Sequence, residues 1–265
     1  MIKEQVTSTE AADSAWGKLY RIGGYAALMA LAVVLIEGLI VVIIQAVWLN
    51  SGRFGVIVGG QGGQPGTVIG WFNLFQNNRL IGLLDDAILD IAVVALLGPV
   101  FLALFAPLRR TNQSWMAVAT PLAFAGIAAY VATNTSLSLL YLSDQYAAAT
   151  AEAQRSLLLA AGQGIIAVGG GGLFWSTGFI LVAVAGLIVA AVMRTGKLFG
   201  IATAWAGILA NGLFLVNYIA SVFVSATSNV STILVGCATI LMFIWWILIA
   251  RKLFQLDVKL KHGYL

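Results

Sequence analysis

Charged residues are scarce in this chain. Asp, Glu, Lys and Arg make up only 9% of its 265 residues, whereas 61% are hydrophobic. A soluble domain carries about 25% charged residues. One core cannot bury this much apolar surface, and water does not tolerate it exposed. Together with a mean hydropathy of +0.98, the composition excludes an ordinary soluble domain and indicates lipid as the solvent.

Cysteine and histidine are almost absent, with one residue of each. Cys237 lies in an apolar run, and a single cysteine excludes an intramolecular disulfide and a thiolate metal site. His262 lies in the polar C-terminal stretch, so no histidine-dependent triad is expected within the apolar runs. We therefore expect no haem, copper or histidine-bound zinc, no metal site and no other cofactor.

Six apolar segments are each long enough to cross a lipid core of about 30 Å as a helix. They cover residues of about 22–49, 81–107, 114–141, 172–193, 199–223 and 230–250. The spans must be helical, because an isolated strand in lipid leaves its backbone groups unpaired. The sequence thus predicts an all-α, polytopic transmembrane helix bundle. It has an N-terminal segment 1–21, a six-helix domain 22–250 and a tail 251–265.

Lysine and arginine are divided unevenly between the two sides of the predicted bundle. One set, formed by the two ends of the chain and the second and fourth connections, holds eleven basic residues. The other connections hold only Arg53, Arg79 and Arg155. Since cytoplasmic loops carry the excess of basic residues, both termini are predicted to be cytoplasmic. The same distribution explains the net charge of +4 without a nucleic-acid partner, and leaves membrane lipids as the expected surroundings.

Two connections on the opposite side are long. Residues 50–80 begin Gly-rich and continue with mixed aromatic and amide residues, as an interfacial helix does. Residues 143–171 begin with Ser143, a residue type that favours a helix N-cap. We expect both connections to form amphipathic segments that lie over the outer face, with helices over 66–78 and 150–166.

Several stretches resemble the bacterial membrane proteins of domain-of-unknown-function family 4386. The stretches are Tyr146–Arg155, Leu157–Gly162, Met193–Gly200, Thr203–Leu209 and the acidic Leu83–Asp90. The resemblance covers residues of about 20–250 and includes the six-span layout. It implies a prokaryotic protein of the cell inner membrane, and it supplies no activity and no catalytic residues.

Polar side chains concentrate in the outer halves of the predicted spans, where an ionised group costs about 2.5–3.5 kcal/mol or more. The candidate binding residues are Glu37, Asp86, Asp90, Tyr130, Asn134, Asn211 and Tyr218. Glu37 is expected near the middle of the first span, facing the bundle and close to Asp90. Tyr130, Asn134 and Tyr141 are expected on one face of the third span, because spacings of four and seven return to the same side of a helix. Together these residues suit a pocket that opens to the outside.

The same residues also allow a purely structural interpretation. Polar side chains in membrane helices often serve as interhelical hydrogen bonds worth about 0.6 kcal/mol. Asn134 and Asn211 fit that role, and Glu37 fits it as a protonated acid. Asp85 fits a solvated charge at a helix start.

Three functions therefore stay open. The first is binding or transport of a small molecule, cation or lipid through the outer pocket. The second is an accessory membrane protein without chemistry of its own. The third is a lipid-acting enzyme with paired carboxylates as acid and base. The sequence identifies no catalytic residue, no specific ligand and no oligomeric state.

Overall fold

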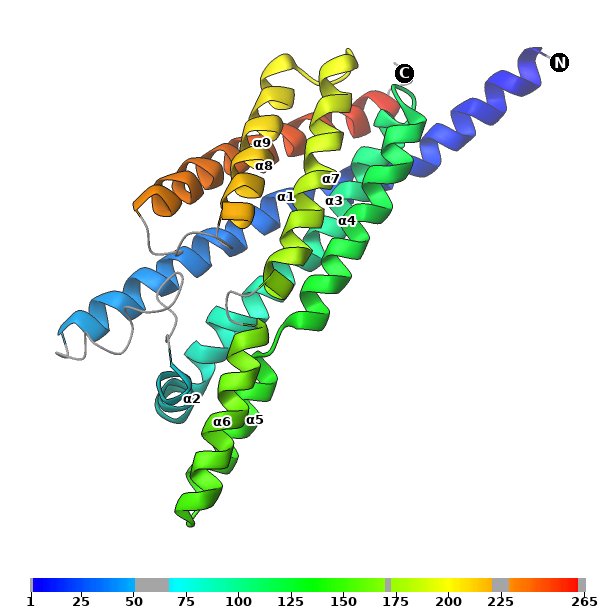
Figure 1. Ribbon diagram of the computed structural model, residues 1–265. Helices are drawn as coiled ribbons and strands as arrows, with labels where there is room; N and C mark the ends of the chain where they lie inside the picture. Colours follow the sequence, from blue (N-terminus) through cyan, green and yellow to red (C-terminus); the bar gives the residue numbers. More distant parts are fainter. Residues whose placement is uncertain (1, 51–66, 170–172, 221–228, 262–265) are drawn as a thin grey trace.

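A computed structural model describes residues 2–50, 67–169, 173–220 and 229–261, with side chains at 16–40, 67–84, 87–167, 177–220 and 233–260 (Figure 1). In these ranges the chain forms nine α-helices and one π-helical turn, and no strand. The helices are α1 (Ile2–Asn50), α2 (Val68–Leu83), α3 (Leu89–Leu108), α4 (Gln113–Thr133), α5 (Ser136–Ala148), α6 (Glu152–Gly169), α7 (Leu173–Thr195), α8 (Ile201–Ala220) and α9 (Asn229–Lys261). The π turn, Leu84–Ile88, joins α2 to α3.

Six helical stretches in the described part are long and apolar enough to cross a membrane. They are Trp16–Ile40, Leu89–Leu108, Gln113–Ala148, Thr177–Thr195, Ile201–Ala220 and Ile233–Leu260. Their outer faces expose large apolar side chains such as Leu39 (63%), Ile201 (67%) and Ile240 (62%). Patches of this kind are unfavourable in water and favourable against lipid tails. The predicted fold class is confirmed: the chain is a multi-pass membrane protein with an all-helical bundle.

The six spanning helices pack in a closed ring. Helices α1, α3, α4, α7, α8 and α9 each contact the next in this order, and α9 returns to contact α1. We call one end of the ring the basic end. It carries Arg21, Arg109, Arg110, Arg194, Lys197 and Lys259. We call the opposite end, from which α2, α5 and α6 project, the lobe end (Figure 1).

Glycines allow the ring helices to approach closely. A Cβ on Gly126 of α4 would lie 2.7 Å from the carbonyl oxygen of Gly178 on α7. A Cβ on Gly23 of α1 would lie 2.1 Å from the Cβ of Ala103 on α3. Small residues at such crossings let two backbones pack directly in lipid, where no hydrophobic force drives helices together.

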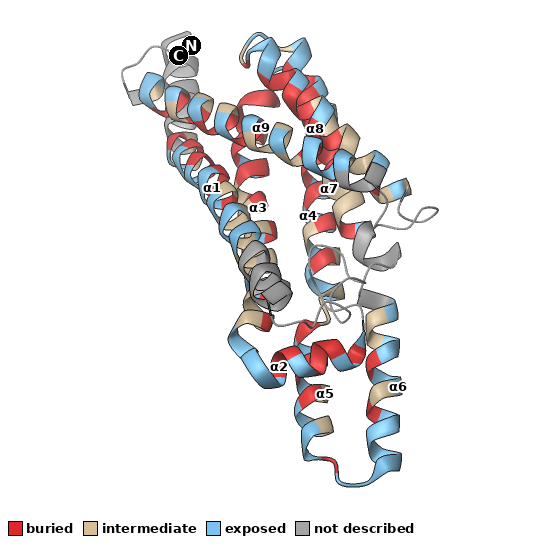
Figure 2. Ribbon diagram, turned by 90° about the vertical axis from the view of Figure 1, so that its left-hand side faces the viewer, coloured by how far each residue is buried: buried red, intermediate tan, exposed pale blue. Residues whose placement is uncertain are grey.

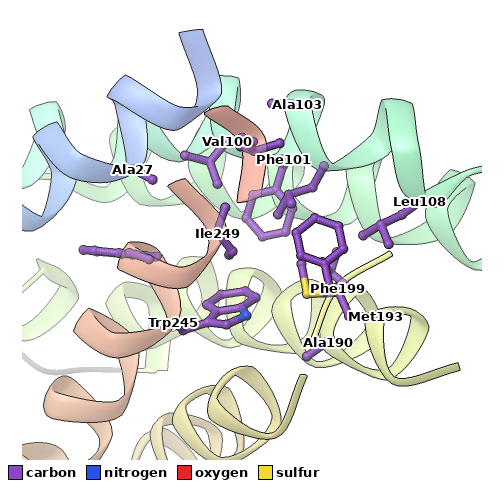
Figure 3. Packing of buried hydrophobic residues seen from close by; sticks show 14 of the residues in the cluster. Ala27, Val100, Phe101, Ala103, Leu108, Ala190, Met193, Phe199, Trp245 and Ile249 are labelled. Carbon is purple, nitrogen blue, oxygen red and sulfur yellow. The ribbon is translucent and has the colours of Figure 1, made fainter. Parts of the chain in front are cut away.

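The largest apolar core lies in the half of the ring near the basic end. Figure 3 shows Ala27 of α1, Val100 and Phe101 of α3, Met193 of α7 and Ile249 of α9 packed together. Phe199, from the α7–α8 connection, completes this cluster from the basic end. This half of the ring is therefore held together mainly by apolar packing.

Helices α2, α5 and α6 form a separate unit, which we call the lobe. Val68, Phe72 and Phe75 of α2 pack with Leu139 and Leu140 of α5 in a second apolar cluster. Figure 2 shows α2 crosswise at the junction with the ring, while α5 and α6 extend beyond it as a hairpin. Both predicted outer segments are thus helical. The second does not lie flat over the bundle, because α6 pairs with α5 and points away.

One predicted boundary is wrong. The third span, 114–141, is not one helix: α4 ends at Thr133, and Asn134 has extended backbone (φ −69°, ψ 119°). Tyr141 therefore belongs to α5, where it is 64% exposed, and does not share a face with Tyr130. At the chain ends, helices α1 and α9 continue through most of the predicted segment 1–21 and tail 251–265. The Gly-rich part of the connection 50–80, residues 59–65, lies outside the described residues.

Candidate functional site

Four polar side chains from four spans meet at the lobe end of the ring. They are Glu37 of α1, Asp90 of α3, Tyr130 of α4 and Tyr218 of α8, and we call them the carboxylate cluster. The phenol of Tyr130 donates a hydrogen bond to Oδ2 of Asp90. The carboxyl groups of Glu37 and Asp90 also form a hydrogen bond, and Tyr218 is close enough to Asp90 to interact with it electrostatically. The expected proximity of Glu37 and Asp90 is confirmed.

The four members of the carboxylate cluster lie at similar distances from the basic end of the ring. Each member lies about 17 to 21 residues from the basic end of its span, roughly 25 to 32 Å at 1.5 Å per residue. An apolar lipid core is about 30 Å thick. The cluster therefore lies at the lobe end of the apolar spans. Asp90 stands in the first turn of α3, whereas α1 continues beyond Glu37 to Asn50. The expected place of Glu37 near the middle of the first span stays a prediction.

The hydrogen bond between Glu37 and Asp90 can form only when the pair carries a proton. A carboxylate only accepts hydrogen bonds, so a bond between two carboxyl groups requires that one of them carries a proton. Two ionised acids in contact in a poorly solvated site would repel strongly. Tyr130, only 1% exposed, donates a further hydrogen bond to Asp90. The pair of Glu37 and Asp90 therefore shares at least one proton.

Aromatic rings extend the cluster to one more helix, α7. The Tyr130 ring lies 4.7 Å from that of Phe179 on α7, centroid to centroid, at 57°. Phe179 in turn stacks on Tyr218 at 5.5 Å and 12°, and Tyr218 stacks on Phe214 at 5.9 Å and 14°. Such rings present negative faces that attract cations. A pair of carboxyl groups beside a run of four rings is chemically suited to a small cation.

The backbone is irregular immediately before Asp90. Asn78 interrupts α2 with φ −153° and ψ 70°, and the π turn Leu84–Ile88 follows before α3 begins. Single π turns occur frequently at functional sites, because they shift the register of the side chains that follow. The predicted candidate Asp86 lies within this turn, but its side chain, like that of Asp85, is outside the described residues.

The two asparagine candidates stand apart from the carboxylate pair. Asn134 follows the end of α4, and its Oδ1 accepts a hydrogen bond from the backbone N–H of Ser136 at 3.3 Å. Asn211, 2% exposed, donates from Nδ2 to the carbonyl of Gly207 one turn earlier. It packs against Gly186, where an added Cβ would lie 2.2 Å from its Oδ1. Both of these hydrogen bonds lie within one segment of chain, whereas the structural interpretation expects interhelical bonds; Asn211 meets a second helix through its packing on Gly186.

Phe179 and Phe214 are members of the site that sequence reasoning missed. The i, i+4 spacing of Phe214 and Tyr218 on one helix was a usable signal for the second stacked pair. Phe179 gave no such signal, since its position between Tyr130 and Tyr218 depends on three helices packing together. Among the described residues no group of three or more His, Cys, Asp or Glu side chains is arranged to hold a metal ion.

Comparison with protein-family models, with curated proteins and with solved structures finds no match to this chain. The resemblance to family 4386 therefore stays an expectation from the sequence.

Proposed function

We propose that this chain is a protein of the cell inner membrane with both termini in the cytoplasm and the lobe outside. The support is the eleven-to-three division of basic residues, which groups most positive charge at one end of the ring. Aromatic partners at that end fit a membrane interface. The guanidinium of Arg109 lies 4.9 Å from the Trp16 ring, and that of Arg194 lies 4.9 Å from the Trp205 ring.

We further propose that the carboxylate cluster binds a small cation, in exchange for the proton that Glu37 and Asp90 share. The observation that carries this proposal is the hydrogen bond between the two carboxyl groups, with Tyr130 as an additional donor to Asp90. Ionisable groups in membrane helices commonly mark ion and proton pathways. A bound cation would compensate the second negative charge once the proton leaves. Movement of that cation between the two sides of the membrane is the transport form of the same proposal.

The test is proton release on cation binding. The purified full-length protein is placed in weak buffer at neutral pH with an indicator dye, and sodium, potassium or tetramethylammonium chloride is added. We expect at least one of these cations to release up to one proton per chain. Glu37→Gln and Asp90→Asn should release none, because neither can form the two-acid pair.

Asp144→Asn is the matched control. It removes an acid from the lobe, where Asp144 forms an exposed ion pair with Arg79 at 3.0 Å, outside the cluster. This variant should release protons as the parent does. The absence of proton release from the parent with all three cations would refute cation–proton exchange.

An accessory protein is the second candidate. The hydrogen bonds described for Asn134 and Asn211 are local to their own segments, and the cluster joins α1, α3 and α4 as a structural bond would. In that role Glu37→Gln preserves stability, since an amide can replace the neutral acid. The parent then shows no response to cations.

A further inference from the structure

A second site lies at the basic end, away from the carboxylate cluster. It is a cavity of about 360 Å³ between α1, α9 and the connections α3–α4 and α7–α8. Its lining residues are Tyr20, Pro107, Arg110, Thr111, Lys197, Leu198, Leu256 and Leu260. The lining combines two cationic side chains and two hydroxyl groups with an apolar wall of proline and leucines.

Packing between two connections brings the two cations together. Gly196 lies directly against Thr111, where an added Cβ would stand 2.8 Å from Oγ1 of the threonine. Arg110 and Lys197 are the chain neighbours of these two residues, so the tight contact places both at one cavity. The close approach depends on the missing side chain at Gly196.

One acid beside this wall is already compensated. Asp257, adjacent to the lining residue Leu256, is 7% exposed and accepts two hydrogen bonds of 3.2 Å from the guanidinium of Arg21. The ion pair joins α1 to α9 directly beside the cavity. The charge that the lining itself presents is therefore positive.

We propose that this cavity binds the phosphate headgroup of an anionic phospholipid. Arg110 and Lys197 supply charge for the phosphate, and Arg in particular suits phosphate recognition. The apolar wall of Pro107, Leu198 and Leu256 accommodates the start of the acyl chains. Basic pockets between transmembrane helices bind acidic headgroups in this manner. A free phosphate ion would gain from the cations but would leave the apolar wall unused.

The experiment measures lipid binding to the delipidated, full-length protein by native mass spectrometry. The probes are dioleoylphosphatidylglycerol, dioleoylphosphatidylcholine and inorganic phosphate. The parent should bind the anionic lipid in preference to the zwitterionic one. Each neutralised cation should weaken binding about fivefold, so Lys197→Gln loses about fivefold and Arg110→Gln/Lys197→Gln roughly 30-fold. Both side chains are exposed, so their neutral substitution leaves the core intact.

The control is Lys18→Gln/Arg194→Gln, which removes the same charge from exposed positions that do not line the cavity. It should bind phosphatidylglycerol within about twofold of the parent, because nonlocal charge is strongly screened. Equal losses of phosphatidylglycerol binding in the two double variants would overturn the assignment of the lipid site to this cavity. Saturation by inorganic phosphate, with no further binding of phosphatidylglycerol, would overturn the assignment to a lipid and indicate a free anion.

Discussion

The phenol of Tyr130 on α4 donates a hydrogen bond to Oδ2 of Asp90 on α3, at the lobe end of the ring. Asp90 is also bonded to Glu37 on α1, so one carboxyl group joins three spans. In lipid, where no water can act as a partner, such a bond satisfies polar groups that would otherwise lack one. It therefore contributes to helix packing, and the bond between the two acids requires that they share a proton.

The first prediction concerns Tyr130→Phe, which removes the hydroxyl donor and keeps the ring beside Phe179. Loss of a donor to a half-buried carboxyl group should lower the free energy of unfolding by about 1–3 kcal/mol. Thermal unfolding of the purified protein in detergent measures this. A double-mutant cycle with Asp90→Asn should show that the two losses are not additive. Additive losses would mean that the bond contributes nothing.

The six spans and the Glu37–Asp90 contact were predictable, because long apolar runs and similar depths in adjacent antiparallel helices are local properties of the sequence. The break after Thr133 was not, since Leu137 to Leu142 keep the sequence apolar beyond it. There the hydroxyl of Thr133 donates to backbone carbonyls of the last turn, and Asn134 accepts from Ser136. The Tyr130–Phe179–Tyr218 stacking depends on three-helix packing, which the pattern of one chain does not contain.

The second prediction concerns the crossing of α4 and α7. Gly126→Ala places a Cβ 2.7 Å from the carbonyl oxygen of Gly178, so the helices must separate. Overpacking of this kind should cost about 1–3 kcal/mol of unfolding free energy. Gly38→Ala is the matched control, because a Cβ there has nothing within 4 Å. The control should unfold at the parent's temperature or above. Equal unfolding temperatures for the two variants would contradict the close approach of α4 and α7 at Gly126.

The third prediction concerns Ser143, which holds α2 to α5. Its buried hydroxyl donates to the carbonyl of Phe72 at 3.1 Å and accepts from Nε2 of Gln76 at 3.0 Å. Ser143→Ala leaves that carbonyl without this donor, which should cost about 1–3 kcal/mol. Hydrogen exchange should accelerate in α2 and α5 but not in α9. Ser156→Ala, an exposed serine of α6, should leave exchange in α2 unchanged.

The fourth prediction is the orientation of the chain. In a Cys237→Ala background, a cysteine introduced by Glu152→Cys in α6 should react with an impermeant maleimide added to intact cells. A cysteine introduced by Lys197→Cys in the α7–α8 connection should react only after lysis. Labelling of the second position from outside would reverse the proposed topology.

The last prediction is the shared proton, measured by the infrared C=O stretch of protonated carboxyl groups in the purified protein at neutral pH. The parent should show such a band, and Glu37→Gln should shift or remove it, since two acids no longer share a proton there. Tyr130→Phe should retain the band at a shifted frequency. A parent spectrum without a protonated carboxyl group at neutral pH would contradict the account.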